Sequence, residues 1–205
     1  NTPILAEVPK ILNTKTESLL ISVDSQTAEA FRTLAHNLNF INTEKLVGIA
    51  PVIAVTSSVK GEGKTTVSFN IARTYHQLKK NVLLVGADLR NPQLHPYLEL
   101  SKNTMGLSHY LSKQNSSWED YLCNIETDTH KFDVLLSGAI PPMPSVLLAS
   151  QRFKDFLEEA RKKYDYIILD TAPTLLVADT LTFIKQVDFT LYVLRSGITE
   201  KELVG

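Results

Sequence analysis

The sequence predicts an α/β fold in which helices cover both faces of a mostly parallel central sheet. Segments with the 3.6-residue spacing of amphipathic helices alternate with short apolar runs. Continuous apolar runs of this length are typical of parallel strands buried on both faces. Here they occupy residues 52–56, 82–85, 134–136, 166–169 and 189–194. A strand, a helix and a second strand in this order form a right-handed βαβ unit, and such sheets bind ligands at the carboxyl ends of their strands.

The chain begins with a mixed segment, residues 1–24, that contains Pro3 and Pro9. We expect an irregular linker there, with one short strand at residues 19–21. The remaining residues, 25–205, are expected to form a single domain, since a chain of 205 residues is long enough for a full hydrophobic core. The absence of an initial methionine suggests that the chain is a piece of a longer protein.

A helix is expected from Ser25, with Asp24 or Ser25 as its cap. Apolar residues recur at helical spacing and form one face: Ala28, Phe31, Leu34, Ala35, Leu38 and Ile41. Glu29, Arg32 and His36 form a polar stripe on the other side. From the residues alone, a solvated face with one weak ion pair explains this stripe as well as a functional contact does.

A phosphate-binding loop follows the strand at 52–56 and opens a helix expected over residues 66–79. Gly61 and Gly63 permit backbone conformations that turn several N–H groups toward one anion, and the helix adds the positive end of its dipole. Lys64 can reach the β- and γ-phosphates, and the Thr65 hydroxyl can bind magnesium. Ser58 stands where the usual loop pattern has glycine. The sheet is therefore expected to be P-loop NTPase-like, in three αβα layers.

Two further strands deliver carboxylates to the same edge of the sheet. The run at 82–85 leads to Asp88 and Arg90, and the run at 166–169 ends directly at Asp170. An apolar strand that ends in aspartate is the pattern with which nucleotide hydrolases and transferases hold magnesium. Paired with the phosphate loop, Asp88 and Asp170 are therefore candidates for the magnesium site.

The other segments carry fewer signals. Short helices are expected at residues 106–111 and 118–124, and a longer helix, capped by Ser145, at 146–163. A helix at 177–186 precedes the last strand, and a first helical turn is expected near Gly205. The histidines at 95, 109 and 130 have no metal-ligand spacing.

Composition excludes some classes of protein. The net charge of −1 gives no argument for nucleic acid or for an anionic membrane surface. The single cysteine, Cys123, excludes an internal disulfide and suits a reducing compartment. The longest apolar run has ten residues and includes Gly48 and Pro51, which is too short to cross a bilayer. The start does not resemble a signal peptide.

Three motifs in order, K-G-E-G-K-T-T, L-L-V-G-A-D-L-R-N-P and Y-D-Y-I-I-L-D-T-A-P, resemble those of the bacterial tyrosine kinases. These kinases are cytoplasmic domains of capsular and exopolysaccharide export systems and are related to the MinD/ParA ATPases. The E-A-F-R-T-L segment from Glu29 resembles the family's subunit-contact helix, and the P-P-M-P-S segment from Pro141 resembles its proline-rich loop. The lead-in from Pro3 resembles the linker from a membrane-anchored part.

The resemblance implies an ATP-dependent protein-tyrosine autokinase that uses Mg²⁺ and binds ATP or ADP. Lys64, Asp88 and Asp170 would be catalytic; Thr65, Asp88 and Asp170 would surround the metal; and Glu29 and Arg32 would serve a subunit interface. The nucleotide would be held by Lys60, Gly61, Glu62, Gly63, Lys64, Thr65, Thr66 and Arg90. Implied partners are further copies of the chain, a membrane-anchored polysaccharide co-polymerase segment and a tyrosine phosphatase, but no nucleic acid. The implied location is cytoplasmic, at the inner face of the cell membrane.

Three departures from the family's pattern bear on activity. Gly86 replaces the first aspartate of the D-x-D motif, which could remove general-base assistance of roughly a hundredfold. Ala35 replaces a further arginine of the interface motif. The seven tyrosines are scattered, and no tyrosine cluster follows Val204.

Two alternatives stay open from the sequence. A catalytically weak ATP-binding assembly module of the polysaccharide export machinery is favoured by Gly86 and Ala35. A MinD/ParA-like ATPase switch is favoured by Lys60, since those ATPases use a lysine at that position to reach the partner's phosphates.

Overall fold

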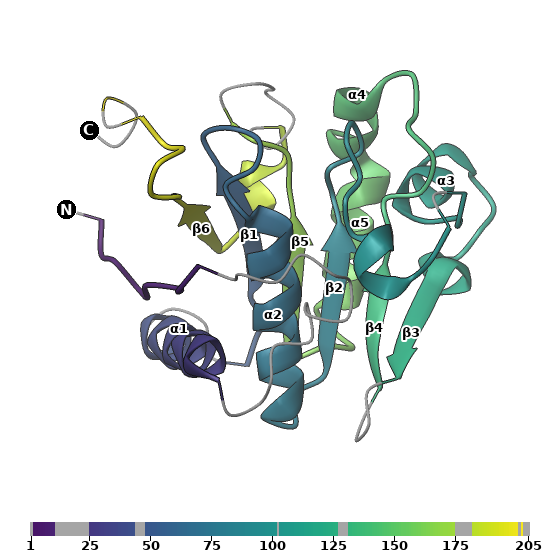
Figure 1. Cartoon of the computed structure of the whole chain (residues 1–205). Coiled ribbons are helices and arrows are strands. Elements are labelled where there is room, and N and C mark those ends of the chain that lie inside the picture. Colours follow the sequence, from purple (N-terminus) through teal and green to yellow (C-terminus); the bar gives the residue numbers. More distant parts are fainter. Residues whose placement is uncertain are drawn as a thin grey trace.

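A computed structural model describes residues 2–10, 25–43, 48–101, 103–126, 131–174, 182–200 and 202. Several features expected from the sequence lie outside these ranges: the strand at 19–21, most of the helix at 177–186, the turn near Gly205 and His130. Within them, a central sheet is enclosed by helices (Figure 1).

The sheet has six strands in the order β3-β4-β2-β5-β1-β6. All neighbouring pairs are parallel except β3 and β4. The strands are β1 (Val52–Ser57), β2 (Val82–Gly86), β3 (Leu122–Glu126), β4 (Lys131–Leu135), β5 (Tyr166–Asp170) and β6 (Phe189–Val193). The mostly parallel sheet expected from the apolar runs is confirmed. Every residue of β1, β2 and β5 is buried, as expected for strands covered on both faces.

Two hydrophobic clusters fill the space on either side of the sheet, so the three αβα layers are confirmed. On one side, α1 (Gln26–Thr43) and α2 (Lys64–Gln77) contribute Phe31 and Phe69 to the first cluster. On the other side, α3 (Leu107–Ser112) and α5 (Gln151–Ala160) contribute Leu107 and Phe153 to the second. Successive residues of each central strand alternate between the two clusters, because side chains along a strand point to opposite faces.

The helix α1 forms as its apolar spacing predicts. The N–H of Ala28 donates to Ser25 Oγ at 3.1 Å, so Ser25 caps the helix. Phe31, Leu34, Ala35 and Leu38 are buried along the predicted face. The segment 2–10 lies against this helix, and Asn37 Nδ2 donates to the carbonyl of Leu5 at 2.7 Å.

Two sequence predictions are wrong in detail. The single helix expected at 146–163 is two helices, α4 (Pro144–Leu148) and α5, because Ser150 Oγ accepts the N–H of Phe153 at 3.2 Å and caps a new helix. The segment expected to be helical at 118–124 is a short 3₁₀ turn, η3 (Trp118–Tyr121), followed by β3. β3 pairs antiparallel with β4, so tertiary pairing overrides the weak local preference.

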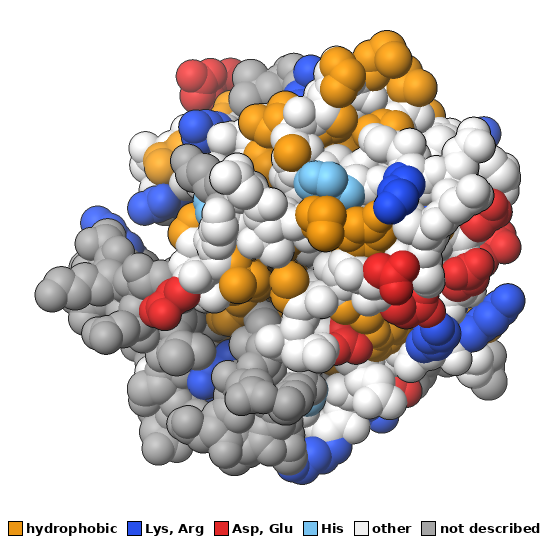
Figure 2. Space-filling model, turned by 90° about the vertical axis from the view of Figure 1, so that its right-hand side faces the viewer, with side chains coloured by type: hydrophobic (Ala, Val, Ile, Leu, Met, Phe, Trp, Pro, Cys, Tyr) orange, Lys and Arg blue, Asp and Glu red, His pale blue; other side chains and the backbone are white. Residues whose placement is uncertain are grey.

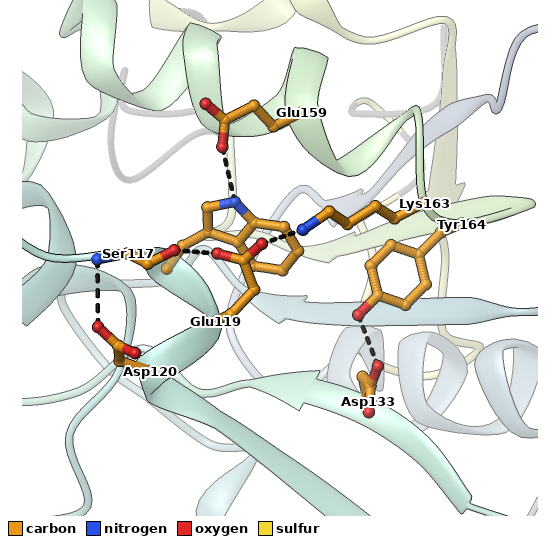
Figure 3. A network of polar contacts seen from close by, with 8 residues as sticks. Ser117, Glu119, Asp120, Asp133, Glu159, Lys163 and Tyr164 are labelled. Atoms are coloured by element: carbon orange, nitrogen blue, oxygen red, sulfur yellow. Dashed lines mark hydrogen bonds and ion pairs between the residues drawn. The ribbon is translucent and has the colours of Figure 1, made fainter.

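A polar network fastens this edge hairpin to α5 (Figure 3). Trp118 is 1% exposed, and its indole N–H donates to Glu159 at 2.9 Å. Lys163 pairs with Glu119 and lies 5.2 Å from the centre of the Trp118 ring. Tyr164 donates to Asp133 at 2.6 Å. The network joins three segments well separated in sequence and stabilises the sheet edge opposite β6.

Among the residues that the structure describes, no helix is both long enough and apolar enough to span a membrane.

Candidate active site

A cavity of about 480 Å³ opens at the carboxyl ends of the central strands. The strand register brings these ends together, since Val55 of β1 and Gly86 of β2 both lie opposite Asp170 of β5. The predicted site residues that line it are Lys60, Gly61, Gly63, Lys64, Thr65, Thr66, Asp88 and Arg90. These residues come from the first two motifs. Asp170, from the third, does not itself line the cavity but contacts Thr65, which does.

The phosphate loop connects β1 to α2 and has the backbone its glycines allow. Gly61 has a φ of 90° and Gly63 a φ of 97°, in the left-handed region that other residues rarely adopt. Gly63 immediately precedes α2, and the helix begins at Lys64, two residues earlier than the sequence suggested. The N–H groups of the first helical turn therefore border the cavity, where the helix dipole favours an anion.

Asp170 is 2% exposed and lies next to the cavity without lining it. Thr65 Oγ1 donates to its Oδ2 at 2.8 Å, and Ser68 Oγ donates to its Oδ1 at 3.2 Å. Burial raises the pKa of this carboxyl group to about 7; the hydrogen bond from Thr65 opposes the rise, the charge of Asp88 adds to it and Lys64 also opposes it. Thr65 and Asp170 thus place a hydroxyl and a carboxylate side by side, the oxygen donors that Mg²⁺ prefers.

Asp88 is tied to Asp170 through the backbone. The N–H groups of Ala87 and Asp88 both donate to the carbonyl of Asp170, at 2.8 and 3.0 Å. The Asp88 Oδ1 atom accepts the N–H groups of Arg90 and Asn91, at 3.2 and 2.9 Å, which closes the turn after β2. The two carboxylates are therefore held at fixed positions on neighbouring strands.

Lys64 is 8% exposed and carries its charge among these carboxylates. Burial lowers the pKa of its ammonium group, and Asp170, Asp88 and Glu62 counteract the effect. Arg90 lies at the edge of the cavity, where one guanidinium nitrogen donates to Ser145 Oγ at 3.1 Å.

The side chain of Glu62 does not line the cavity, although the resemblance placed this residue with the nucleotide. Its carboxylate accepts the N–H of Val59 at 2.8 Å and pairs with the Thr199 hydroxyl, and the residue is 3% exposed. Burial alone would raise the pKa of Glu62, but hydrogen bonds from Thr199, Val59 and Ser57 bring it below its usual value. Glu62 therefore stabilises the phosphate loop through contacts with Val59 and Thr199, on the side away from the cavity.

Sequence reasoning missed several residues that line the cavity. Tyr97 lies in the short 3₁₀ helix His95–Leu98, and its hydroxyl is 2.8 Å from Thr66 Oγ1. Arg195 donates to the carbonyl of Gly61 at 2.9 Å. Asn91, Gln93, Ala172 and Pro173 complete the wall. Arg195 follows the carboxyl end of β6, a position that could have signalled it; Tyr97 gives no comparable signal.

No cluster of three His, Cys, Asp or Glu side chains suited to a metal occurs among the residues that the structure describes. A metal at Thr65 and Asp170 would therefore need ligands from a bound phosphate group and from water, as Mg²⁺ in nucleotide sites commonly has.

Gly86 stands in a confined place beside Asp170. A Cβ added there would lie 2.5 Å from Ser137 Oγ, 2.8 Å from Ser137 N and 3.3 Å from Leu94 Cδ1. The first two distances are too short for non-bonded atoms, so any side chain at this position requires Ser137 to move. The same contact applies to an aspartate, so Gly86→Asp is not a simple gain of a carboxylate in this backbone.

We expect Gly86→Ala to lower the free energy of unfolding by about 1–3 kcal/mol, the usual effect of overpacking. Urea denaturation measures it. Adding Ser137→Ala removes the hydroxyl contact and should restore part of the loss, while the contact with Ser137 N remains. A Gly86→Ala protein as stable as the parent would contradict the close packing described above.

Glu29 and Arg32 lie apart from the cavity, on the exposed side of α1. Arg32 Nε donates to Glu29 Oε1 at 3.0 Å, and this hydrogen bond lowers the pKa of Glu29. Figure 1 shows α1 beside α2 at the lower left, away from the phosphate loop at the top of the sheet. Ala35 is fully buried, and its carbonyl accepts the Tyr75 hydroxyl at 3.3 Å. An arginine at that position would enter the core and not the exposed face.

Residues 50–189 match the AAA domain family. The chain is 38% identical to the tyrosine-protein kinase YwqD of Bacillus subtilis over 178 residues, which cover 87% of this chain and 72% of that protein. It is 37% identical over 150 residues to the tyrosine-protein kinase CpsD of Streptococcus pneumoniae, covering 73% of this chain and 65% of that protein. It is also 34% identical over 191 residues to the tyrosine-protein kinase wzc of Salmonella typhi, covering 91% of this chain and 26% of that protein.

Solved structures agree with these relatives. The kinase domain of Escherichia coli tyrosine kinase ETK superposes with a TM-score of 0.85 at 28% identity, covering 98% of this chain and 82% of that one. The MinD protein of Pyrococcus horikoshii, solved with Mg-ADP, has a TM-score of 0.56 at 21% identity, covering 70% of this chain and 57% of that one. The second likeness concerns the fold alone.

Proposed function

Because the chain belongs to the bacterial tyrosine-protein kinases, we propose that it transfers the γ-phosphoryl group of Mg-ATP to tyrosine hydroxyls and thereby regulates capsular or exopolysaccharide production. The observation that carries this proposal is the 2.8 Å hydrogen bond from Thr65 to the buried Asp170, because Thr65 lines the same cavity as Lys64. Phosphoryl transfer depends mainly on positioning and on neutralising charge. A hydroxyl, a carboxylate and an ammonium group around one phosphate loop meet that need.

The residues present fit Mg-ATP. Gly61 and Gly63 line the cavity, and an added Cβ at either would meet no atom within 4 Å. Lys64 would neutralise the β- and γ-phosphates, and Thr65 with Asp170 would hold the metal. Bound Mg²⁺ would supply further charge neutralisation on the transferred group.

The chain's own residues then act on geometry and charge. Asp170 orients Thr65 through their hydrogen bond, and Asp88 provides a second carboxylate at the cavity wall. Arg90 and Tyr97 restrict the cavity at its edge. Since Gly86 supplies no carboxylate, we expect weak general-base assistance and a turnover roughly a hundredfold below that of an otherwise equal site with one.

The surface near the cavity suits an incoming protein segment. Ile140, Met143 and Val146 are 64%, 61% and 59% exposed, and Ser145 among them contacts Arg90. Figure 2 shows hydrophobic side chains gathered at the top of the molecule, the level at which Figure 1 places α4. An apolar rim of this kind favours a tyrosine-bearing peptide over a small polar substrate.

The test is incubation of the chain with labelled ATP, Mg²⁺ and a tyrosine-containing copolymer. Phosphotyrosine that depends on Mg²⁺ and is absent from an Asp170→Asn protein would support the kinase. Nucleotide binding without any phosphotyrosine, on the copolymer or on a tail-complete chain, would contradict it.

The second candidate is an ATP-binding assembly module, which Gly86 favours. It predicts a change of oligomer mass on adding Mg-ATP, measured by light scattering, without phosphoryl transfer. A third, the ATPase switch, depends on Lys60, which is exposed and lines the cavity. It requires that Lys60→Ala abolish nucleotide-dependent dimers, and an unchanged dimer would exclude it.

We also propose self-association through Glu29 and Arg32, a membrane-anchored co-polymerase segment as partner, control by a tyrosine phosphatase, and a place at the cytoplasmic face of the membrane. The family resemblance and the exposed position of the pair on α1 support the first of these.

Arg32→Ala should weaken self-association at least about tenfold, because an exposed guanidinium at an interface is commonly a dominant contact. The thermal midpoint should change by less than about 2 °C, since an exposed ion pair within one helix contributes little to folding. Sedimentation velocity with Mg-ATP present measures the first effect. Lys162→Ala, which removes an exposed cation outside α1, is the control. Association of the Arg32→Ala protein equal to that of the parent would contradict the interface.

A further inference from the structure

The seven tyrosines, all within the described residues, differ sharply in access. Tyr192 is 41% exposed, whereas Tyr75, Tyr110, Tyr121 and Tyr166 are buried. Tyr97 and Tyr164 are only partly exposed. The hydroxyls of Tyr97, Tyr164 and Tyr192 all have hydrogen-bond partners, so exposure of the side chain is what distinguishes Tyr192. A protein kinase acts on a hydroxyl it can reach, so access singles out Tyr192 within the fold.

Tyr192 also touches the phosphate loop. Its hydroxyl is 2.9 Å from Ser58 Oγ, at the start of the loop, and 3.2 Å from Thr174 Oγ1, beyond the end of β5. The same segment contacts the loop twice more, through Arg195 on the Gly61 carbonyl and Thr199 on the Glu62 carboxylate. Residues 192–199 therefore contact the loop at three points, Ser58, Gly61 and Glu62.

The geometry points to Tyr192 as a phosphorylation site by which a second copy of this chain lowers the nucleotide affinity of the first. The inference rests on the kinase activity proposed above. In the step, the Tyr192 Oη attacks the γ-phosphorus of ATP held by the second copy. The bond from that phosphorus to the β–γ bridging oxygen breaks, ADP leaves, and the phenolic proton passes to solvent.

The donor must be another copy because of where Tyr192 is fixed. β6 pairs with β1 residue by residue, with Tyr192 opposite Thr56, and Tyr192 does not line its own chain's cavity. β6 is the edge of the sheet formed by the described strands, so its outer side can be approached by another molecule. Figure 1 shows β6 at the left margin of the sheet.

Phosphorylation would loosen the loop for two reasons. The added group removes the hydroxyl that joins Ser58 to Thr174. It also places about −1.5 to −2 charges beside the loop, where Lys60 and Arg195 are the exposed cations. A phosphate attracts guanidinium groups strongly, so Arg195 should leave the Gly61 carbonyl. We expect the dissociation constant for Mg-ADP to rise at least fivefold.

The experiment incubates the full 205-residue chain with Mg-ATP and the tyrosine-containing copolymer, and maps phosphate by peptide mass spectrometry. The inference expects phosphate at Tyr192, formed at a rate per chain that increases with protein concentration. The phosphorylated chain is then separated, and its affinity for Mg-ADP is measured by calorimetry. Tyr192→Phe should remove this phosphate, and Thr190→Ser, on the same exposed strand, should not.

The outcomes separate the two proposals. A labelled copolymer with Tyr192 unmodified overturns the inference and leaves the kinase in place, whereas no label on either overturns both. A rate per chain independent of concentration overturns the second copy as donor. If the phosphorylated chain binds Mg-ADP as tightly as the unmodified chain, phosphorylation of Tyr192 does not lower nucleotide affinity and that part of the inference is overturned.

Discussion

Replacing Lys64 with alanine should reduce phosphoryl transfer at least about a thousandfold. The ammonium group is buried beside Asp170 and Asp88, where charge interactions are stronger than in water, and it lies on the phosphate side of the loop. Removing it takes away the main protein cation that would offset the charge developing on the transferred group. Single-turnover transfer of label from ATP measures the effect.

The nucleotide affinity of the Lys64→Ala protein should fall less, by about tenfold, because the loop backbone and α2 still bind the phosphates. Lys162→Ala, which removes an exposed lysine after α5, is the control for loss of charge. If transfer by the Lys64→Ala protein stays within tenfold of the parent, Lys64 is not the cation that acts on the transferred group.

Asp170→Asn should separate activity from stability. We expect transfer to fall about a hundredfold to ten-thousandfold, since a neutral amide is a poor partner for Mg²⁺. In the ligand-free protein the same change should be stabilising at pH 8. Asparagine can still accept the Thr65 hydrogen bond, and it avoids placing a charge in a buried position.

The pH dependence follows from the direction of the pKa shift. Burial raises the pKa of Asp170 to about 7, above the unfolded value of about 3.8. Below pH 4 both states are protonated and the group has no effect on stability. Between pH 4 and 7 the unfolded state loses its proton first, so stability decreases as pH rises, by at most about 4 kcal/mol above pH 7.

The stability gain of Asp170→Asn should therefore be present at pH 8 and small at pH 4.5, measured by urea denaturation without nucleotide. Asp155→Asn, at an exposed position on α5, should show neither effect. A destabilised Asp170→Asn protein at pH 8 would mean that the carboxylate makes net favourable contacts in the empty site.

The sequence predicted the parts of the site that lie within single motifs. The phosphate loop, Asp88 and Asp170 each follow a buried strand, and parallel strands bring their carboxyl ends to one edge. Tyr97, Arg195 and the inward turn of Glu62 depend on contacts between distant segments. Arg195 reaches Gly61 across 134 positions, and Glu62 pairs with Thr199 across 137. Local patterns carry no information on such contacts.

The fold was predictable to a similar extent. Runs such as residues 82–85 identify central strands because burial on both faces makes them continuously apolar. β3 was missed since an edge strand, here with Asn124 and Glu126, lacks that pattern and is defined by its pairing with β4. The break between α4 and α5 depends on the cap formed by Ser150, one serine among several in the segment.

The carbonyl of Asp170, which accepts two N–H groups from the turn after β2, links the acidic motifs mechanically. A shift of the Asp170 main chain would strain its hydrogen bonds of 2.8 and 3.0 Å with the N–H groups of Ala87 and Asp88, and neither bond involves a side chain. Ala87 and Asp88 lie 83 and 82 positions before Asp170 in the sequence, and main-chain hydrogen bonds alone join them to it. A design that moves the main chain of Asp170 must therefore also accommodate the turn that carries Asp88.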